Sequence, residues 1–127
     1  MIFIKTYDSY VRRANLYELF RLRKKAIEVM KEVTNQPFSN LEIGSSYIYI
    51  GLMYKDLKEL DLANQYFESA LNLCKNEQYP FSPNYKKIIE CFIENGESEK
   101  ALKWRNHFIE RASYDKKFLK LKKIIIN

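Results

Sequence analysis

The stretch Tyr47-Ile-Tyr-Ile-Gly51-Leu-Met-Tyr54, followed by Ala63-Asn-Gln-Tyr-Phe67-Glu-Ser-Ala70, decides the fold of this chain. Its spacing of aromatic, small and aliphatic residues predicts two short antiparallel helices. Small residues lie where such helices cross, and aromatic side chains fill the gaps around the crossing. Gly51 is the strongest element, because a glycine inside a helix costs about 1 kcal/mol relative to alanine and close helix packing gives a reason for it.

This pattern resembles a tetratricopeptide repeat. Ala63 has counterparts at Ala26 and Ala101, 37 and 38 residues away. The simplest tetratricopeptide repeat has about 34 residues, so the proline-containing links between repeats must be longer. The sequence therefore predicts a single all-α domain, 1–127, of about three antiparallel helix pairs with a C-terminal capping helix. The expected repeats are 7–40, 44–77 and 82–112, and the expected capping helix is 113–126.

Three local features of the sequence refine this prediction or leave an alternative open. No turn residue separates Tyr17 from Ala26, so one long helix is an alternative to the first helix pair. Gly44 and Gly96 are expected in loops, which leaves Gly51 as the one glycine inside a helix. Residues 113–126 place Tyr114, Phe118, Leu121 and Ile125 on one helical face. That face either covers the last repeat or forms a homodimer contact.

Composition limits the functional classes. The net charge is +6, but residues 1–40 carry 8 basic and 4 acidic side chains, 41–77 carry 3 and 6, and 78–127 carry 11 and 6. This basic, acidic, basic order argues against one uniform nucleic-acid face and disfavours nucleic-acid binding. No apolar run has the length of a secretory signal or a membrane span. We expect a soluble, cytoplasmic protein with no membrane partner.

Catalytic and metal-binding patterns are missing from the sequence. His107, the single histidine, has no carboxylate or thiol partner at a local spacing, and there is no glycine-rich phosphate loop. Cys74 and Cys91 lack the spacing of a metal site, so two packed, reduced thiols are expected. The sequence predicts a protein that is not an enzyme and has no cofactor or metal.

In tetratricopeptide-like stacks the first helix of each repeat lines a concave groove, and this resemblance gives the candidate binding residues. The side chains expected there are cationic, amide and apolar, which suits an extended peptide with a carboxylate or acidic groups. The predicted peptide- or partner-binding residues are Arg12, Asn15, Tyr49, Leu52, Lys55, Lys86, Lys87 and Glu90.

The chain also resembles a larger family, the tetratricopeptide-containing peptide receptors of Gram-positive bacteria and their phages. These include the Rap regulators and the arbitrium receptors of Bacillus phages. The resemblance rests on 46–54, on 62–73, on Asn76-Glu-Gln-Tyr79 and on Lys5-Thr-Tyr-Asp-Ser-Tyr-Val11. It implies a regulatory module that binds a peptide or protein, without the family's helix-turn-helix. The alternatives are a self-associating structural adaptor and a basic helical nucleic-acid-binding protein.

Overall fold

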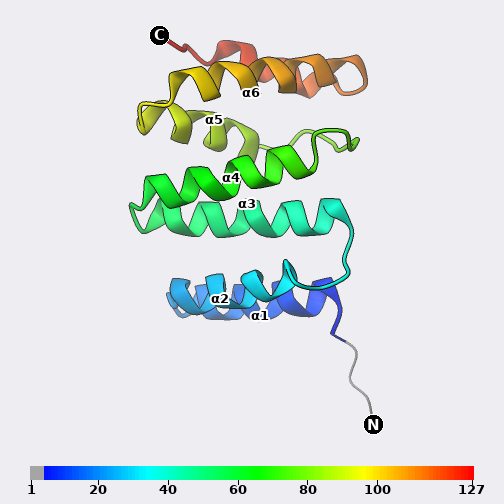
Figure 1. The fold of residues 1–127 in the computed structure, drawn as a ribbon, viewed down its shortest axis with the longest axis vertical. Coiled ribbons are helices and arrows are strands. Elements are labelled where there is room, and N and C mark those ends of the chain that lie inside the picture. Colours follow the sequence, from blue (N-terminus) through cyan, green and yellow to red (C-terminus); the bar gives the residue numbers. More distant parts are fainter. Residues whose placement is uncertain (1–4) are drawn as a thin grey trace. The chain divides into compact units, whose positions relative to one another are not determined.

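The computed structural model describes residues 5–127, and within that range the chain forms helices and connecting segments without a β-strand. The α-helices are α1 (Tyr7–Leu19), α2 (Arg23–Val33), α3 (Asn40–Asp56), α4 (Leu60–Leu73), α5 (Asn84–Glu94) and α6 (Ser98–Glu110). Two 3₁₀ segments follow, η1 (Arg111–Ser113) and η2 (Lys116–Lys123). The α-helices pair as three antiparallel hairpins, α1–α2, α3–α4 and α5–α6 (Figure 1). The predicted all-α class is confirmed.

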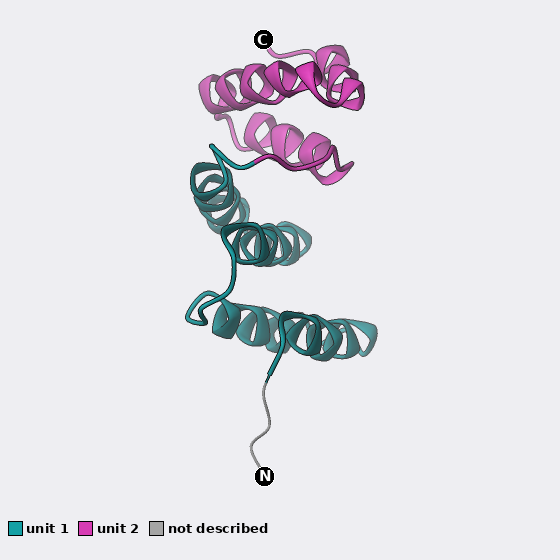
Figure 2. Cartoon of the chain, turned by 90° about the vertical axis from the view of Figure 1, so that its right-hand side faces the viewer, with its two compact units in different colours: residues 1–77 teal, residues 78–127 magenta. Residues whose placement is uncertain are grey.

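The chain divides into two compact units, residues 1–77 and 78–127 (Figure 2). Unit 1 contains the first two hairpins, and α2 packs against α3. Unit 2 contains the third hairpin together with η1 and η2, which pack on α6 and on each other.

All three hairpins use the same turn. In each turn one residue adopts a left-handed backbone conformation: φ is 60° at Arg21, 64° at Lys58 and 74° at Gly96. In each case the next amide donates back to a carbonyl five residues earlier, as Leu22 does to Tyr17 at 2.8 Å. This left-handed residue ends a helix and satisfies its last carbonyls. The turns recur at intervals of 37 and 38 residues, so equivalent positions in the hairpins can be compared directly.

The first hairpin is a helix pair and not one long helix. Its turn is built without glycine, because Arg21 takes the left-handed position that Gly96 takes in the third hairpin. A residue other than glycine pays roughly 1–2 kcal/mol in that region, so composition gave no sign of the break.

The alanines that defined the spacing are all inaccessible to solvent. Ala26, Ala63 and Ala101 are each 0% exposed, and each donates its amide to the residue capping the start of its helix. Gly51 lies directly under the second helix of its hairpin. A Cβ there would overlap the Phe67 ring and lie 3.1 Å from the carbonyl oxygen of Ala63. The close approach inferred from Gly51 is therefore present.

The expectation for Gly44 was wrong. Gly44 lies inside α3 and is buried, and a Cβ at this position would overlap the Cys74 sulfur. The helix begins at Asn40 because Ser39 and Glu42 form a capping box, with the Glu42 amide donating to Ser39 Oγ at 3.1 Å. This cap starts the helix four residues before Gly44. Gly96, in contrast, lies in a turn as predicted.

The core of unit 2 is a cluster of stacked aromatic rings. Tyr85 on α5 stacks on Phe108 of α6 with ring centres 4.7 Å apart, and on Phe118 of η2 at 5.9 Å. Phe108 and Phe118 are each 0% exposed. Offset stacking of this kind adds to the stabilisation that burial itself provides. The ring cluster therefore joins the C-terminal segment to the hairpin.

The C-terminal segment differs from the predicted α-helix of 113–126. Its main element, η2, is a 3₁₀-helix with three residues per turn, so the buried face runs through Phe118 and Leu121 to the half-buried Ile124. Ile125, which α-helical spacing placed on that face, is 79% exposed. Because Phe118 and Leu121 are buried inside unit 2, the segment covers α6, and these two residues are not available for a dimer contact.

Candidate functional site

The eight predicted binding residues are divided between the two units. Arg12 and Asn15 are exposed on α1, whereas Tyr49, Leu52 and Lys55 are half-buried on α3. The other three residues, Lys86, Lys87 and Glu90, are exposed on α5 in unit 2.

Tyr49 holds two helices of unit 1 together. Its hydroxyl donates to Glu18 Oε1 at 3.1 Å, which links α3 to α1. Burial raises the pKa of Tyr49 far above its ordinary value, and the Glu18 carboxylate raises it further because a phenolate would repel this charge. Tyr49 therefore stays a neutral donor, and its hydroxyl is engaged inside the protein.

A groove on unit 2 contains the best-formed candidate site. It has a volume of about 810 Å³, which falls within the usual range for ligand pockets. One wall comes from α5 and the other from η2 and the residues that follow it. The lining residues are Phe81, Pro83, Lys86, Glu90, Ile93, Glu94, Lys120, Leu121, Lys123, Ile124 and Ile125.

Polar contacts fix the wall formed by the C-terminal segment. Asp115 accepts from the Phe81 amide at 2.9 Å and from the Lys117 amide at 3.1 Å, and these bonds lower the pKa of its carboxyl group. Arg105 Nη1 donates to the carbonyl oxygen of Ile124 at 2.7 Å. The segment is thus held by hydrogen bonds at both of its ends.

A second set of contacts joins the residues just before this wall to the segment that leads into α5. The Arg111 guanidinium lies 3.8 Å from the centre of the Tyr79 ring, and its Nη1 donates to the Tyr114 hydroxyl at 2.8 Å. That hydroxyl donates in turn to the Tyr79 carbonyl oxygen at 2.8 Å. His107, the single histidine of the chain, belongs to the same set of contacts, because its Nε2 lies 3.3 Å from Arg111 Nη2.

The groove has an apolar floor and charged edges. Half-buried Ile93 and Ile124 supply apolar surface, while exposed Lys86 and Lys120 add positive charge to the lining. Glu90 and Glu94 add carboxylates along α5. Such a surface can bury apolar side chains of a segment and bind acidic groups at its edge.

Two of the predicted residues, Lys86 and Glu90, belong to this groove, and Lys87 does not. The opposite wall was missed because 113–126 was interpreted as a cover for the last repeat. The sequence feature that could have indicated this wall is the pair of lysines at 120 and 123 beside the apolar run 124–126.

Other site types have no support in the described part of the chain. Among residues 5–127 no three His, Cys, Asp or Glu side chains are grouped in a way that could hold a metal ion. Cys74 and Cys91 are buried, and the Cys74 thiol donates to the Asn40 carbonyl oxygen at 3.2 Å. None of the described helices combines the length and apolar character needed to span a bilayer.

In comparisons with protein-family models, curated proteins and solved structures, the chain has no match.

Proposed function

We propose that this chain is a non-enzymatic binding module of the tetratricopeptide type that holds a peptide or a protein segment in the groove of unit 2. The observation that carries the proposal is the groove itself, about 810 Å³ in volume, whose lining combines apolar residues with three lysines and two glutamates. The recurrence of one hairpin turn at intervals of 37 and 38 residues supports the repeat type.

The lining indicates the chemistry of the ligand. Ile93 and Ile124 favour one or two aliphatic or aromatic side chains, because burying apolar surface is the main source of affinity at such a site. Lys86 and Lys120 favour a carboxylate, either an acidic side chain or the C-terminus of a short peptide. We therefore infer a short, apolar peptide segment with an acidic group at one end.

The same proposal includes a biological setting. The sequence resemblance to Rap regulators and arbitrium receptors supports a role in regulation in a Bacillus-type bacterium or its phage. In that setting the chain acts by holding a peptide or another protein.

A binding experiment with a matched pair of variants tests the groove. The probe is a pool of synthetic hexapeptides with two apolar residues and a free C-terminal carboxylate, compared with the same pool amidated at the C-terminus. Binding is followed by amide chemical shifts of the full chain. Lys86→Glu is compared with Lys87→Glu, because both lysines are exposed on α5 and Lys86 alone lines the groove.

The expected shifts lie at groove residues such as Ile93 and Ile124. We expect the free-acid pool to bind more tightly than the amide pool. Lys86→Glu should weaken binding of the free-acid pool roughly 10- to 100-fold, because a charge-assisted bond is worth roughly 1.5–3 kcal/mol. Equal loss in Lys87→Glu, or shifts confined to unit 1, would reject the groove. Self-association of the unliganded chain with shifts in this groove would favour the structural adaptor instead.

A further inference from the structure

The face that α1 presents away from α2 differs from the equivalent face of α3. On α3, Ile50 is 0% exposed and Met53 is 6% exposed, and both belong to the apolar cluster that joins the second hairpin to the first. The equivalent positions on α1, 37 residues earlier, are Arg13 and Leu16. Arg13 is exposed, and Leu16 is 56% exposed.

The exposed apolar surface continues to the end of the helix. Leu19 is 75% exposed and Phe20 is 67% exposed, whereas Leu57, the equivalent of Phe20, packs against the cluster. Leu19 and Phe20 follow Leu16 by three and four residues, so the three form one stripe on α1 and its C-terminal cap. Within residues 5–127, no element covers this stripe as the first hairpin covers α3.

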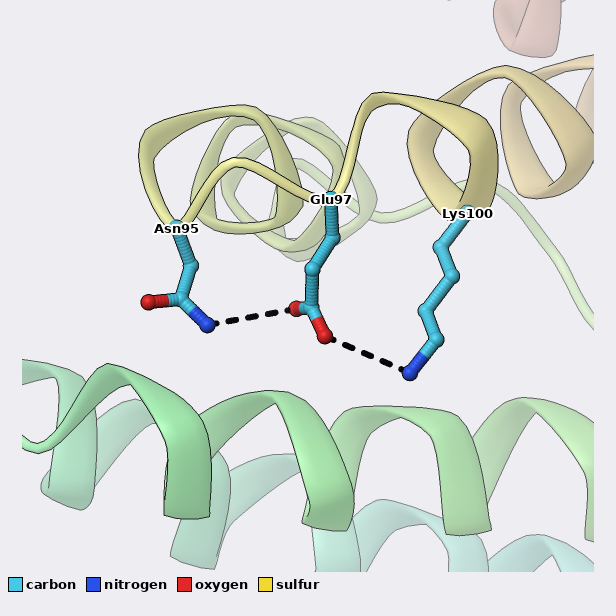
Figure 3. A network of polar contacts seen from close by, with 3 residues as sticks. All are labelled: Asn95, Glu97 and Lys100. Carbon is cyan, nitrogen blue, oxygen red and sulfur yellow. Dashed lines mark hydrogen bonds and ion pairs between the residues drawn. The ribbon is translucent and has the colours of Figure 1, made fainter.

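The turn itself does not require apolar residues. The positions equivalent to Leu19 are Asp56 and Glu94, and those equivalent to Leu22 are Glu59 and Glu97. In the third hairpin Glu97 belongs to a polar network. Glu97 accepts from the Asn95 side-chain amide at 3.4 Å and pairs with Lys100 at 3.3 Å (Figure 3). At these two positions the other hairpins make the same backbone geometry with acidic side chains, so Leu19 and Leu22 of the first need a different explanation.

Positive charge surrounds the apolar stripe. Arg12 and Arg13 precede it on α1, and Arg21, Lys24 and Lys25 follow it at the turn and the start of α2, all of them exposed. The nearest acidic side chain on this helix, Glu18, accepts a hydrogen bond from Tyr49. An occupant of this surface must therefore supply apolar groups in the middle and negative charge at the edges.

We propose that the α1 face, defined here as Leu16, Leu19 and Phe20 with Arg12 and Arg13 at its rim, docks an acidic amphipathic helix of a partner protein. A helix fits because the equivalent face of α3 is covered by helix packing. Acidic character fits because the rim is cationic, and complementary charge steers and orients such a contact. The C-terminal segment of unit 2 is also basic, with lysines at 116, 117, 120, 122 and 123, so contact between this segment of one copy and the α1 face of another would bring like charges together.

The probe is a synthetic helix of roughly 18 residues with leucines at i, i+3, i+4 and i+7 and glutamates on both flanks. A second peptide carries lysines in place of the glutamates. Binding to the full chain is measured by fluorescence anisotropy. The variants are Leu16→Ser and Phe20→Ser, with Leu102→Ser as the matched control because Leu102 is a 44% exposed leucine on α6. All three side chains are exposed, so the variants are expected to fold.

The glutamate peptide should bind the wild-type chain and the Leu102→Ser control with equal affinity. Leu16→Ser and Phe20→Ser should each weaken binding about tenfold, as expected for central apolar contacts. Arg12→Glu should weaken it and reduce its salt dependence. Lys86→Glu, which tests the groove of unit 2, should leave it unchanged, so the two proposals can fail separately.

Three results would overturn the proposal. Equal binding of the lysine peptide would show that charge does not select the occupant. Binding of anionic vesicles that is lost in Phe20→Ser, without peptide binding, would assign the face to a membrane surface. Dimerisation of the wild-type chain that Leu16→Ser abolishes would assign it to a second copy.

Discussion

Replacing Gly51 by alanine should destabilise unit 1, although alanine is the better helix former. On an unhindered helix this change stabilises by about 1 kcal/mol. Here the new methyl group would overlap the ring of Phe67, which is 0% exposed, and would lie 3.1 Å from the carbonyl oxygen of Ala63. Overpacking of a filled core costs about 1–3 kcal/mol. We therefore expect a net loss of about 1 kcal/mol, where propensity alone predicts a gain of similar size.

The assay is urea unfolding followed by far-UV circular dichroism and by tryptophan fluorescence. Trp104, the single tryptophan, lies in unit 2, so its fluorescence reports on that unit, while circular dichroism reports on all helices. The Gly51→Ala transition should shift to lower urea in circular dichroism. In thermal unfolding, a loss of this size corresponds to about 3–6 °C. A variant as stable as the wild type, or more stable, would refute the close-approach argument.

Two controls assign the effect to the predicted contact. Gln65→Gly and Gln65→Ala, at an exposed site on α4, measure helix propensity without a packing change. Phe67→Leu removes part of the ring that the new methyl group would strike. In a double-mutant cycle, Gly51→Ala should cost clearly less in the Phe67→Leu background, since residues in contact do not contribute additively. An additive result would place the strain elsewhere.

Three further predictions concern single contacts. Tyr49→Phe removes the bond to Glu18 and should cost about 0.5–1.5 kcal/mol at pH 7. Because the pKa of Tyr49 is raised in the folded state, its stabilising contribution is complete below its ordinary value near 10 and is lost as pH rises above it. The variant should thus lose less stability than the wild type in alkaline unfolding titrations. Asp115→Ala should lower the stability of unit 2 at neutral pH. Donation from the Phe81 amide lowers the pKa of Asp115, so the difference in stability between the wild type and this variant should shrink as pH falls below the ordinary value near 3.8. Unfolding followed by Trp104 fluorescence measures this difference. Ser39→Ala should cost about 1 kcal/mol by removing the capping box of α3, measured by circular dichroism.

The candidate site was predictable on one side and not on the other. Lys86 and Glu90 follow from counting along a helix whose position the repeat spacing fixed. The facing wall, with Lys120 and Ile124, was not predicted, because a 3₁₀ segment has a shorter period than the α-helix assumed for 113–126. Lys87 was included because a helix count alone cannot tell which of two adjacent exposed lysines faces a neighbouring segment.

The sequence by itself determined what depends on helix periodicity and side-chain size: the all-α class, the recurrence of buried alanines at 26, 63 and 101, and the need for a close approach at Gly51. These follow because helix periodicity and the size of a side chain act locally. Tertiary structure decided the break at Arg21, the burial of Gly44 and the wall of the groove. Each of these depends on a surface that another segment covers, and a sequence pattern fixes which face is apolar without fixing what packs on it.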